Sequence, residues 1–277
     1  MVENIQNLLN GNFSKGKSSK LNFQFEEEMK WSKEKEILGK LLLEQLYDCG
    51  AIKTWYRDKP DGWVLRSKLW SPVYISMRAI SSKNNGSLLL NLIGKSLSKL
   101  IINEIPKFDK VLGLATTGIQ IVTAITMVSN IPSLYTRKLE TNDLENFDSI
   151  IKKYGEHSLI EGDFENNDII VIVDDLVTKL DSALIGKEQL VYEAKKRNKK
   201  ISCNKIVVLI DREQGADIKA KRENLNLHSL IKFKSNLSWL KNKFADIEYQ
   251  IIKEYFEDHT KFQDPQKIKE TISIVKR

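Results

Sequence analysis

Hydrophobic positions recur with two different periods along this chain, and the changes of period mark the expected helices and strands. From Glu34 to Gly50 apolar residues return every three or four positions, which predicts an amphipathic helix that ends at the glycine. The same spacing from Ser87 to Ile105 predicts a second helix. Between them, Ala51 to Arg78 is aromatic and strand-like, and Pro60-Asp61-Gly62 is typical of a β-hairpin turn. We expect a small β-rich accessory lobe at 51–85, with the aromatic side chains as its core rather than as a stacking platform for bases.

From residue 111 onward, short apolar runs alternate with helical patterns. In chain order the expected elements are a strand at Val111–Ala115, a helix at Ile119–Val128, strands at Ser133–Arg137 and Ile169–Val173, a helix at Ser182–Arg197, and strands at Ile206–Ile210 and His228–Phe233. Strands that alternate with helices indicate a parallel sheet with right-handed crossovers and helices on its faces. The predicted fold class is therefore α/β, with several strand ends converging on one edge.

The remaining segments are less regular. Residues 1–30 are rich in Asn, Ser and Lys and are expected to form a poorly ordered arm. The polar stretch from Lys138 to Ile169 lacks strong periodicity and indicates a long binding loop that carries cations. Helical patterns after Leu237 lead into a polar tail, so 241–277 is interpreted as a C-terminal helical extension. The main domain is expected at 31–240, with its α/β core at 86–234.

Ile169–Ala183, with the sequence IIVIVDDLVTKLDSA, carries the strongest chemical signal. A buried strand ends in Asp174 and Asp175, and hydroxyl-bearing residues precede the next helix. In open α/β sheets ligands bind beyond the carboxyl ends of strands, where a helix N-terminus offers free N–H groups to phosphate. A single Asp at this place often only caps the helix. Two adjacent carboxylates also suit a sugar diol or Mg²⁺, so we expect the functional site here.

Composition narrows the possible functions. The 277 residues carry a formal net charge of +7, which favours anionic partners and fits phosphorylated metabolites as well as nucleic acid. Because no RNA-binding or helix-turn-helix signature is present, a nucleic-acid partner is not expected. The cysteines, Cys49 and Cys203, are far apart and suggest neither a zinc site nor a disulfide framework. No signal peptide or membrane-spanning run is visible, so we expect a cytoplasmic protein without membrane contact.

Several short strings resemble the orotate phosphoribosyltransferase family, which joins orotate to phosphoribosyl pyrophosphate (PRPP). The resemblance covers Leu38 to Leu240. The strings are Leu65-Arg66-Ser67 with Ser71-Pro72-Val73-Tyr74-Ile75 and Arg78, Gly113 to Gly118, Arg137-Lys138, Lys152 to Gly155 with Ile160-Glu161-Gly162, Val173 to Ser182, and Leu209 to Gly215 with Leu227-His228-Ser229. It implies a type I phosphoribosyltransferase-like core with a small β-rich hood.

The resemblance also implies a role for each matching residue. Asp174 and Asp175 would hold the ribose hydroxyls of PRPP and, with Lys152, form the catalytic group. Arg66, in place of the family's usual lysine, and Arg212, through the carboxylate, would bind orotate. Mg²⁺ would be held mainly through PRPP, with no firm protein ligand, and some contacts would come from the second subunit of a homodimer. The other PRPP contacts would come from Thr116, Thr117, Gly118, Arg137, Lys138, Lys152, Tyr154, Thr178, Lys179 and Ser182.

The phosphate loop departs from the family pattern, which usually reads Thr, a small residue, Gly, then Ser, Thr or Gly. Here it reads Thr178-Lys179-Leu180-Asp181-Ser182, and Leu180 replaces the glycine that permits close backbone approach. An Asp181 carboxylate about 4 Å from one phosphate charge would cost on the order of 4 kcal/mol at an effective dielectric constant of about 20. Two functions are therefore open: a working orotate phosphoribosyltransferase, or a homologue of the same fold that no longer turns over PRPP and regulates by binding a nucleotide or a protein.

Overall fold

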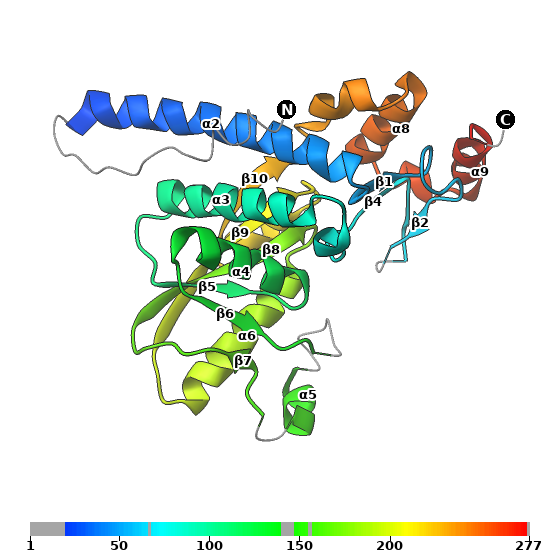
Figure 1. The fold of residues 1–277 in the computed structure, drawn as a ribbon. Helices are drawn as coiled ribbons and strands as arrows, with labels where there is room; N and C mark the ends of the chain where they lie inside the picture. Colours follow the sequence, from blue (N-terminus) through cyan, green and yellow to red (C-terminus); the bar gives the residue numbers. More distant parts are fainter. Residues whose placement is uncertain (1–19, 66–67, 140–146, 155–156, 276–277) are drawn as a thin grey trace.

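A computed structural model describes residues 20–65, 68–139, 147–154 and 157–275 of the chain (Figure 1). At its centre is a six-stranded sheet in the order β10-β9-β8-β5-β6-β7. The strands are β5 (Lys110–Gly113), β6 (Ser133–Thr136), β7 (Ile160–Glu161), β8 (Asp168–Val177), β9 (Ile201–Asp211) and β10 (Asn226–Lys232). Every neighbouring pair is parallel except β6 with β7. The predicted α/β class is confirmed.

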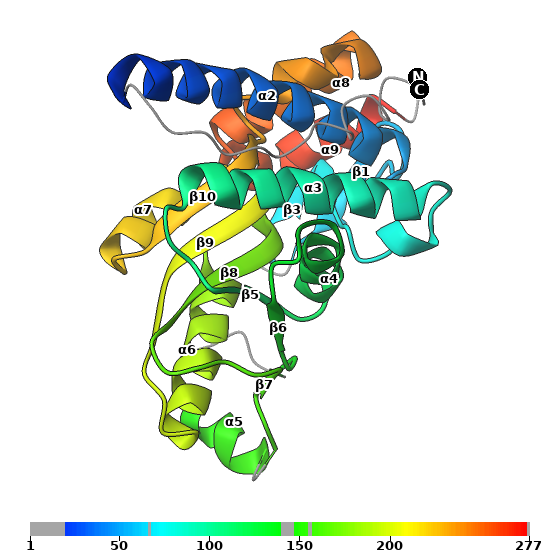
Figure 2. The same cartoon turned by 60° about the vertical axis from the view of Figure 1, so that its left-hand side comes forward.

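Helices cover both faces of this sheet (Figures 1 and 2). On one face α3 (Gly86–Glu104) and α4 (Thr117–Ser129) pack on the residues that include Val171 and Val173 of β8. On the other face α6 (Asp181–Lys196) and α7 (Ala216–Arg222) pack on those that include Ile170 and Ile172. A strand buried on both faces is apolar at every position rather than alternating with polar residues, which explains the run IIVIV before the acids. Among the described residues, no helix is long and apolar enough to cross a membrane.

The long helix α2 (Lys20–Asp48) lies across α3 on the outside of the molecule (Figure 1). Its buried face includes Leu38, Leu42 and Leu46, at the predicted spacing. The helix begins at Lys20 rather than near Glu34, so the prediction of a poorly ordered arm was wrong for residues 20–30. The first nineteen residues of that arm lie outside the described part of the chain.

The accessory lobe consists of two short antiparallel ribbons beside the short 3₁₀-helix η1 (Ile80–Ser82). One ribbon pairs β1 (Ile52–Thr54) with β4 (Val73–Ile75), and the other pairs β2 (Trp63–Val64) with β3 (Trp70–Ser71). Trp55 and Trp70 are buried, as expected of core residues. The hairpin turn was assigned to the wrong place: Gly62 closes a turn by donating to the Lys59 carbonyl oxygen, but the paired strands β2 and β3 are joined by the later residues 65–69.

The stretch predicted as a long loop contains the helix α5 (Phe147–Tyr154) and the edge strand β7. Phe147 and Ile151 of α5 pack against Ile185 of α6 in a small separate cluster. A helix of two turns offers few apolar positions to a periodicity search, which is why the pattern did not reveal it. Residues 140–146 and 155–156 of this stretch are outside the described ranges.

The C-terminal extension expected at 241–277 is largely helical as far as residue 273. It contains η3 (Leu237–Lys243), α8 (Asp246–Glu257), η4 (Lys261–Gln263) and α9 (Pro265–Ser273). The prediction of a polar tail after Asp258 was wrong, because Phe262 is fully buried and stacks on Trp70 with ring centroids 6.2 Å apart. Trp55 Nε1 donates to the Thr271 carbonyl oxygen at 3.0 Å. The extension therefore packs on the accessory lobe.

Candidate active site

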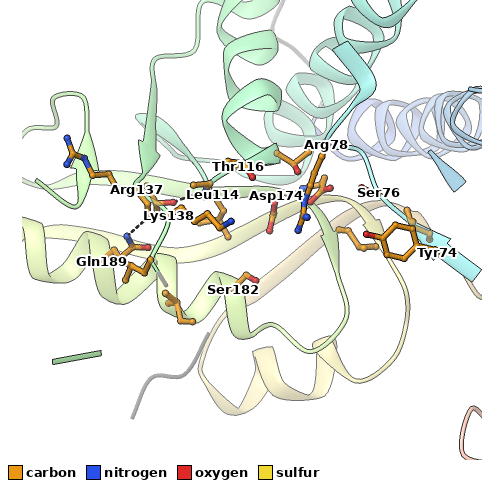
Figure 3. A pocket seen from close by; sticks show the side chains of 18 residues that line it. Tyr74, Ser76, Arg78, Leu114, Thr116, Arg137, Lys138, Asp174, Ser182 and Gln189 are labelled. Atoms are coloured by element: carbon orange, nitrogen blue, oxygen red, sulfur yellow. Dashed lines mark hydrogen bonds between the residues drawn. The ribbon is translucent and has the colours of Figure 1, made fainter. Parts of the chain in front are cut away.

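Two cavities open at the carboxyl edge of the sheet and share Asp174, and Figure 3 shows the first of them. The first cavity, of about 210 Å³, is lined mostly by residues that follow β4, β5, β6 and β8 and by one side of α6. The second cavity, of about 480 Å³, lies between the loop after β8, the end of β9, the β2–β3 ribbon and the C-terminal segment. Tyr74, Arg78 and Ser182 also line both cavities. The convergence of strand ends that the sequence predicted has therefore produced one continuous site.

Asp174 and Asp175 are half-buried in β8, where Asp174 lines both cavities and Asp175 lines the first. The backbone N–H of Asp175 donates to Oδ1 of Asp174 at 2.9 Å. Burial, followed by the negative charge of Asp175, raises the pKa of Asp174 well above its usual range. Burial also raises the pKa of Asp175, although hydrogen bonds and the charge of Arg78 oppose that rise. The charge of Arg78 only partly offsets the burial of the pair, which suits the pair to a cation or to sugar hydroxyls.

The donor set around these acids fits a magnesium ion that arrives with its substrate. Among the described residues, no group of three or more His, Cys, Asp or Glu side chains could hold a metal ion. Mg²⁺ commonly keeps several waters and binds one or two carboxylates together with substrate phosphates. Asp174 and Asp175 could supply those carboxylates, and a bound cation would favour the charged forms that burial opposes.

The loop from Thr178 to Ser182 connects β8 to α6, and Thr178, Lys179 and Ser182 line the second cavity. Leu180 has a left-handed backbone with φ of 71°, and its side chain is buried in the core on the α6 face. The Asp181 carboxylate accepts a hydrogen bond from Lys219 Nζ on α7 at 2.6 Å. The charge expected to oppose a phosphate is therefore paired with a cation, although Leu180 and Asp181 also line the second cavity.

The loop between β5 and α4 brings Thr116 and Thr117 to the first cavity. Gly118 instead permits close packing of α4. A Cβ atom at Gly118 would lie 2.8 Å from the carbonyl oxygen of Val173 on β8, and one at Gly113 would lie 2.5 Å from the carbonyl oxygen of Gly118. These contacts keep the first turn of α4 against the sheet and so hold the threonines at the edge of the cavity.

Arg137 and Lys138 follow β6 and line the first cavity. Arg137 Nε donates to Glu161 Oε1 at 2.6 Å, and in Figure 3 the guanidinium points away from the cavity while Lys138 turns toward Asp174. Gln189 on α6 donates to the backbone oxygen of Arg137 at 2.8 Å and holds this turn in place. The side chains of Arg137 and Lys138 therefore point in different directions, although the two residues are adjacent in sequence.

Arg212 lies at the end of β9 and lines the second cavity. It is only 4% exposed, and its Nε and Nη2 atoms have no hydrogen-bond partner among the described residues. Its Cζ atom lies 5.5 Å from the centroid of the Phe256 ring. Burial lowers the pKa of Arg212, whereas Tyr255 favours the charged form. A buried cation with donors to spare is suited to an anionic ligand in this cavity.

Other predicted residues lie away from the cavities or beyond the described ranges. Lys152 is exposed on α5 and is not among the described residues that line either cavity. Tyr154 is the last residue of that helix. Arg66 is outside the described residues, so its predicted contact with orotate stays a prediction.

Several lining residues received no role from the sequence, among them Tyr74, Arg78, Gln189, Tyr255 and His259. Tyr74 and Arg78 belong to a group of residues that supported the family resemblance, so the sequence could have indicated that they lie at the site. Gln189 lies on the predicted helix after the acids without a distinguishing pattern. Tyr255 and His259 belong to the C-terminal segment, beyond the reach of the resemblance, and nothing in their local sequence connects them to the site.

Comparison with known proteins bears on the same site. No protein-family model matches the chain. Uridine 5′-monophosphate synthase of Bos taurus is 31% identical over 194 residues, which cover 70% of this chain but only 35% of the bovine protein. The chain thus spans about a third of the length of that relative. The crystal structure of orotate phosphoribosyltransferase from Aeropyrum pernix has a TM-score of 0.54 at 24% identity, covering 73% of this chain and 97% of that one.

A further relative matches over most of its own length. Orotate phosphoribosyltransferase of Methanosphaera stadtmanae is 34% identical over 137 residues, which cover 49% of this chain and 67% of the relative. The structural likeness supports the type I phosphoribosyltransferase fold, and the sequence likeness supports the family. This chain belongs to the orotate phosphoribosyltransferase family, whose members are phosphoribosyltransferases.

Proposed function

We propose that this protein catalyses the Mg²⁺-dependent transfer of ribose 5-phosphate from PRPP to orotate, which yields orotidine 5′-monophosphate and pyrophosphate. The observation that carries the proposal is the position of Asp174 where two chemically different cavities meet, with Asp175 next to it on the first cavity. The first cavity has the cation of Lys138, with Arg137 next to it paired to Glu161, and the second has the buried Arg212. The names of the relatives point in the same direction.

The reaction needs no side-chain nucleophile. A ring nitrogen of orotate forms the new bond to the ribose carbon as the bond from that carbon to the pyrophosphate oxygen breaks, and the proton of that ring nitrogen passes to solvent. Positive charge develops on the sugar and negative charge on the leaving group, so carboxylates beside the ribose and cations beside the pyrophosphate stabilise the transition state. Asp174 and Asp175 would take the first role and Lys138 the second. Mg²⁺ bound with PRPP would neutralise further charge on the pyrophosphate.

The proposal includes a homodimer in which Lys152 completes the partner's first cavity. Its support is that Lys152 is exposed on α5 and lines neither cavity described for its own chain. Mixing two inactive variants, Lys152→Ala and Asp174→Asn, tests this arrangement after subunit exchange. Each hybrid dimer would contain one intact site, so about a quarter of the wild-type activity should return. No recovery in hybrids confirmed by mass spectrometry would contradict the shared site.

The direct test is product analysis with purified protein, PRPP and orotate. We expect pyrophosphate and orotidine 5′-monophosphate in equal amounts with Mg²⁺, and neither product with EDTA. Uracil, which lacks the carboxylate, should be a poor acceptor because Arg212 would be left without its partner. PRPP binding without turnover would instead support the regulatory homologue.

A further inference from the structure

The outer wall of the second cavity comes from the C-terminal segment, residues 246–273, which lies beyond the segment that resembles the family. Tyr255, near the end of α8, and His259, just after that helix, line this cavity together with Arg212. On the opposite side are Val64 and Leu69 of the β2–β3 ribbon. The base-binding half of the proposed site is thus enclosed by parts of the chain nearly two hundred positions apart, as the bond between Trp70 and Gln263 at a separation of 193 residues shows.

Tyr255 connects this wall to Arg212. It is 1% exposed and makes edge-to-face contacts with Phe256 at 5.3 Å and with His259 at 6.4 Å between ring centroids. Tyr255 also favours the charged form of Arg212, and Phe256 lies beneath the guanidinium. The side chains of α8 therefore fix the orientation of the buried cation and place the His259 ring against the same cluster.

Gln263 fastens the segment to the β2–β3 ribbon. Its Oε1 accepts a hydrogen bond from the Trp70 backbone N–H at 2.8 Å, and its Nε2 donates to the Trp70 carbonyl oxygen at 3.1 Å. The same Nε2 donates to the His259 carbonyl oxygen at 3.0 Å. The amide thus pairs with Trp70 as a neighbouring strand would, and it holds the backbone of His259 as well. A ribbon with two residues in each strand is marginal on its own, so this support matters.

We propose that the C-terminal segment is the specificity wall of the base-binding site and that His259 contacts the anionic pyrimidine there. The inference rests on the proposed function. The His259 ring is half-buried at the cavity and carries an N–H donor in either tautomer. A planar ring held between Arg212 and His259 can accept from both through its carboxylate and exocyclic oxygens. Tyr255 and Gln263 act through the residues that they position.

The test compares steady-state kinetics of the wild type, His259→Ala, His259→Asn and the control Lys261→Ala. Lys261 is on the same segment, has a 74% exposed side chain and does not line the second cavity. In His259→Ala, the KM for orotate should rise roughly tenfold, the value expected for one lost hydrogen bond to a charged group. The KM for PRPP should stay unchanged, and His259→Asn, which retains a donor, should recover part of the orotate affinity.

Gln263→Glu tests the supporting role, because it keeps the acceptor for the Trp70 N–H and removes both donated bonds. It should also raise the KM for orotate while the KM for PRPP is unchanged. An unchanged KM for orotate in His259→Ala, or an equal rise in both KM values, would overturn the inference.

Calorimetric titration with orotidine 5′-monophosphate separates this inference from the proposed function, because binding requires no turnover. If the wild type is inactive but binds the nucleotide in a His259-dependent manner, the result would contradict the proposed function and support the role of the C-terminal segment in base binding. Binding that does not depend on His259, or no binding at all, would contradict the inference that the C-terminal segment contacts the pyrimidine.

Discussion

Replacing Arg212 by Met should change stability and function in opposite directions, with a more stable protein that uses orotate poorly. Among the described residues, the Nε and Nη2 atoms of this buried guanidinium have no hydrogen-bond partner, and burial lowers the pKa of Arg212, so we expect its charge to destabilise the unliganded protein at neutral pH. Met fills much of the same space without a charge. We expect the variant to be more stable than the wild type and unable to use orotate well.

Both effects can be given magnitudes. Two hydrogen bonds to a carboxylate, at about 1.5 to 3 kcal/mol each, predict a loss of roughly 3 to 6 kcal/mol in transition-state binding, or about a hundredfold to ten-thousandfold in kcat/KM for orotate. Two unsatisfied donors cost about 1 to 3 kcal/mol each in the free protein, and the lost interaction with Phe256 offsets about 2 kcal/mol. The net gain of about 2 kcal/mol corresponds to a Tm increase of roughly 5 °C.

Scanning calorimetry without ligand and orotate-dependent kinetics measure the two effects on the same preparation. Arg222→Met, an exposed arginine at the end of α7, is the matched control and should change neither quantity. A less stable Arg212→Met variant with normal orotate kinetics would refute the assignment of Arg212 as an anion-binding residue and make it a structural cation.

Four further predictions concern the acids, the phosphate loop and α5. Asp174→Asn should abolish turnover yet raise the Tm at neutral pH. Because the pKa of Asp174 is raised in the folded state, the increase in Tm should appear only as the pH rises above the ordinary Asp range, and an increase that persists at acid pH would contradict this cause. Asp181→Asn should change the KM for PRPP by less than about threefold, since Lys219 already pairs with the carboxylate, and a much tighter KM would show that Asp181 does oppose the phosphate. Leu180→Gly should lower the unfolding free energy by about 2 to 4 kcal/mol in denaturant titrations, because the loss of a buried side chain outweighs about 1 kcal/mol of relieved left-handed strain; an unchanged midpoint would count against that packing role. Lys152→Ala should lower kcat far more than it weakens orotate binding, and the opposite pattern would remove it from the pyrophosphate side.

The central sheet and the position of the acids were predictable because they depend on local patterns. The IIVIV run of β8 must be buried on both faces, and Asp174 and Asp175 then fall at the edge where ligands bind. The helix α6 begins at Asp181, one residue before the predicted start at Ser182. In these cases the nearest neighbours along the chain determine the structure.

The rest depends on partners that are distant in sequence. The carboxylate of Asp181 pairs with Lys219, 38 residues further on. The loop sequence alone predicted only that this carboxylate would oppose a phosphate. His259 reaches the second cavity because Gln263 pairs with Trp70, a contact that no local pattern encodes. The short helix α5 is stabilised by Ile185 of α6 rather than by its own periodicity.

The measurement that tests the account most directly is the loss of orotate absorbance on mixing the protein with PRPP, orotate and Mg²⁺, beside the Asp174→Asn, Asp175→Asn double variant. The amide replacements are isosteric and keep the Asp174 oxygen that accepts the Asp175 N–H. We expect absorbance loss with the wild type and none with the folded double variant. A wild type that leaves orotate unchanged, or a double variant as active as the wild type, would contradict this expectation.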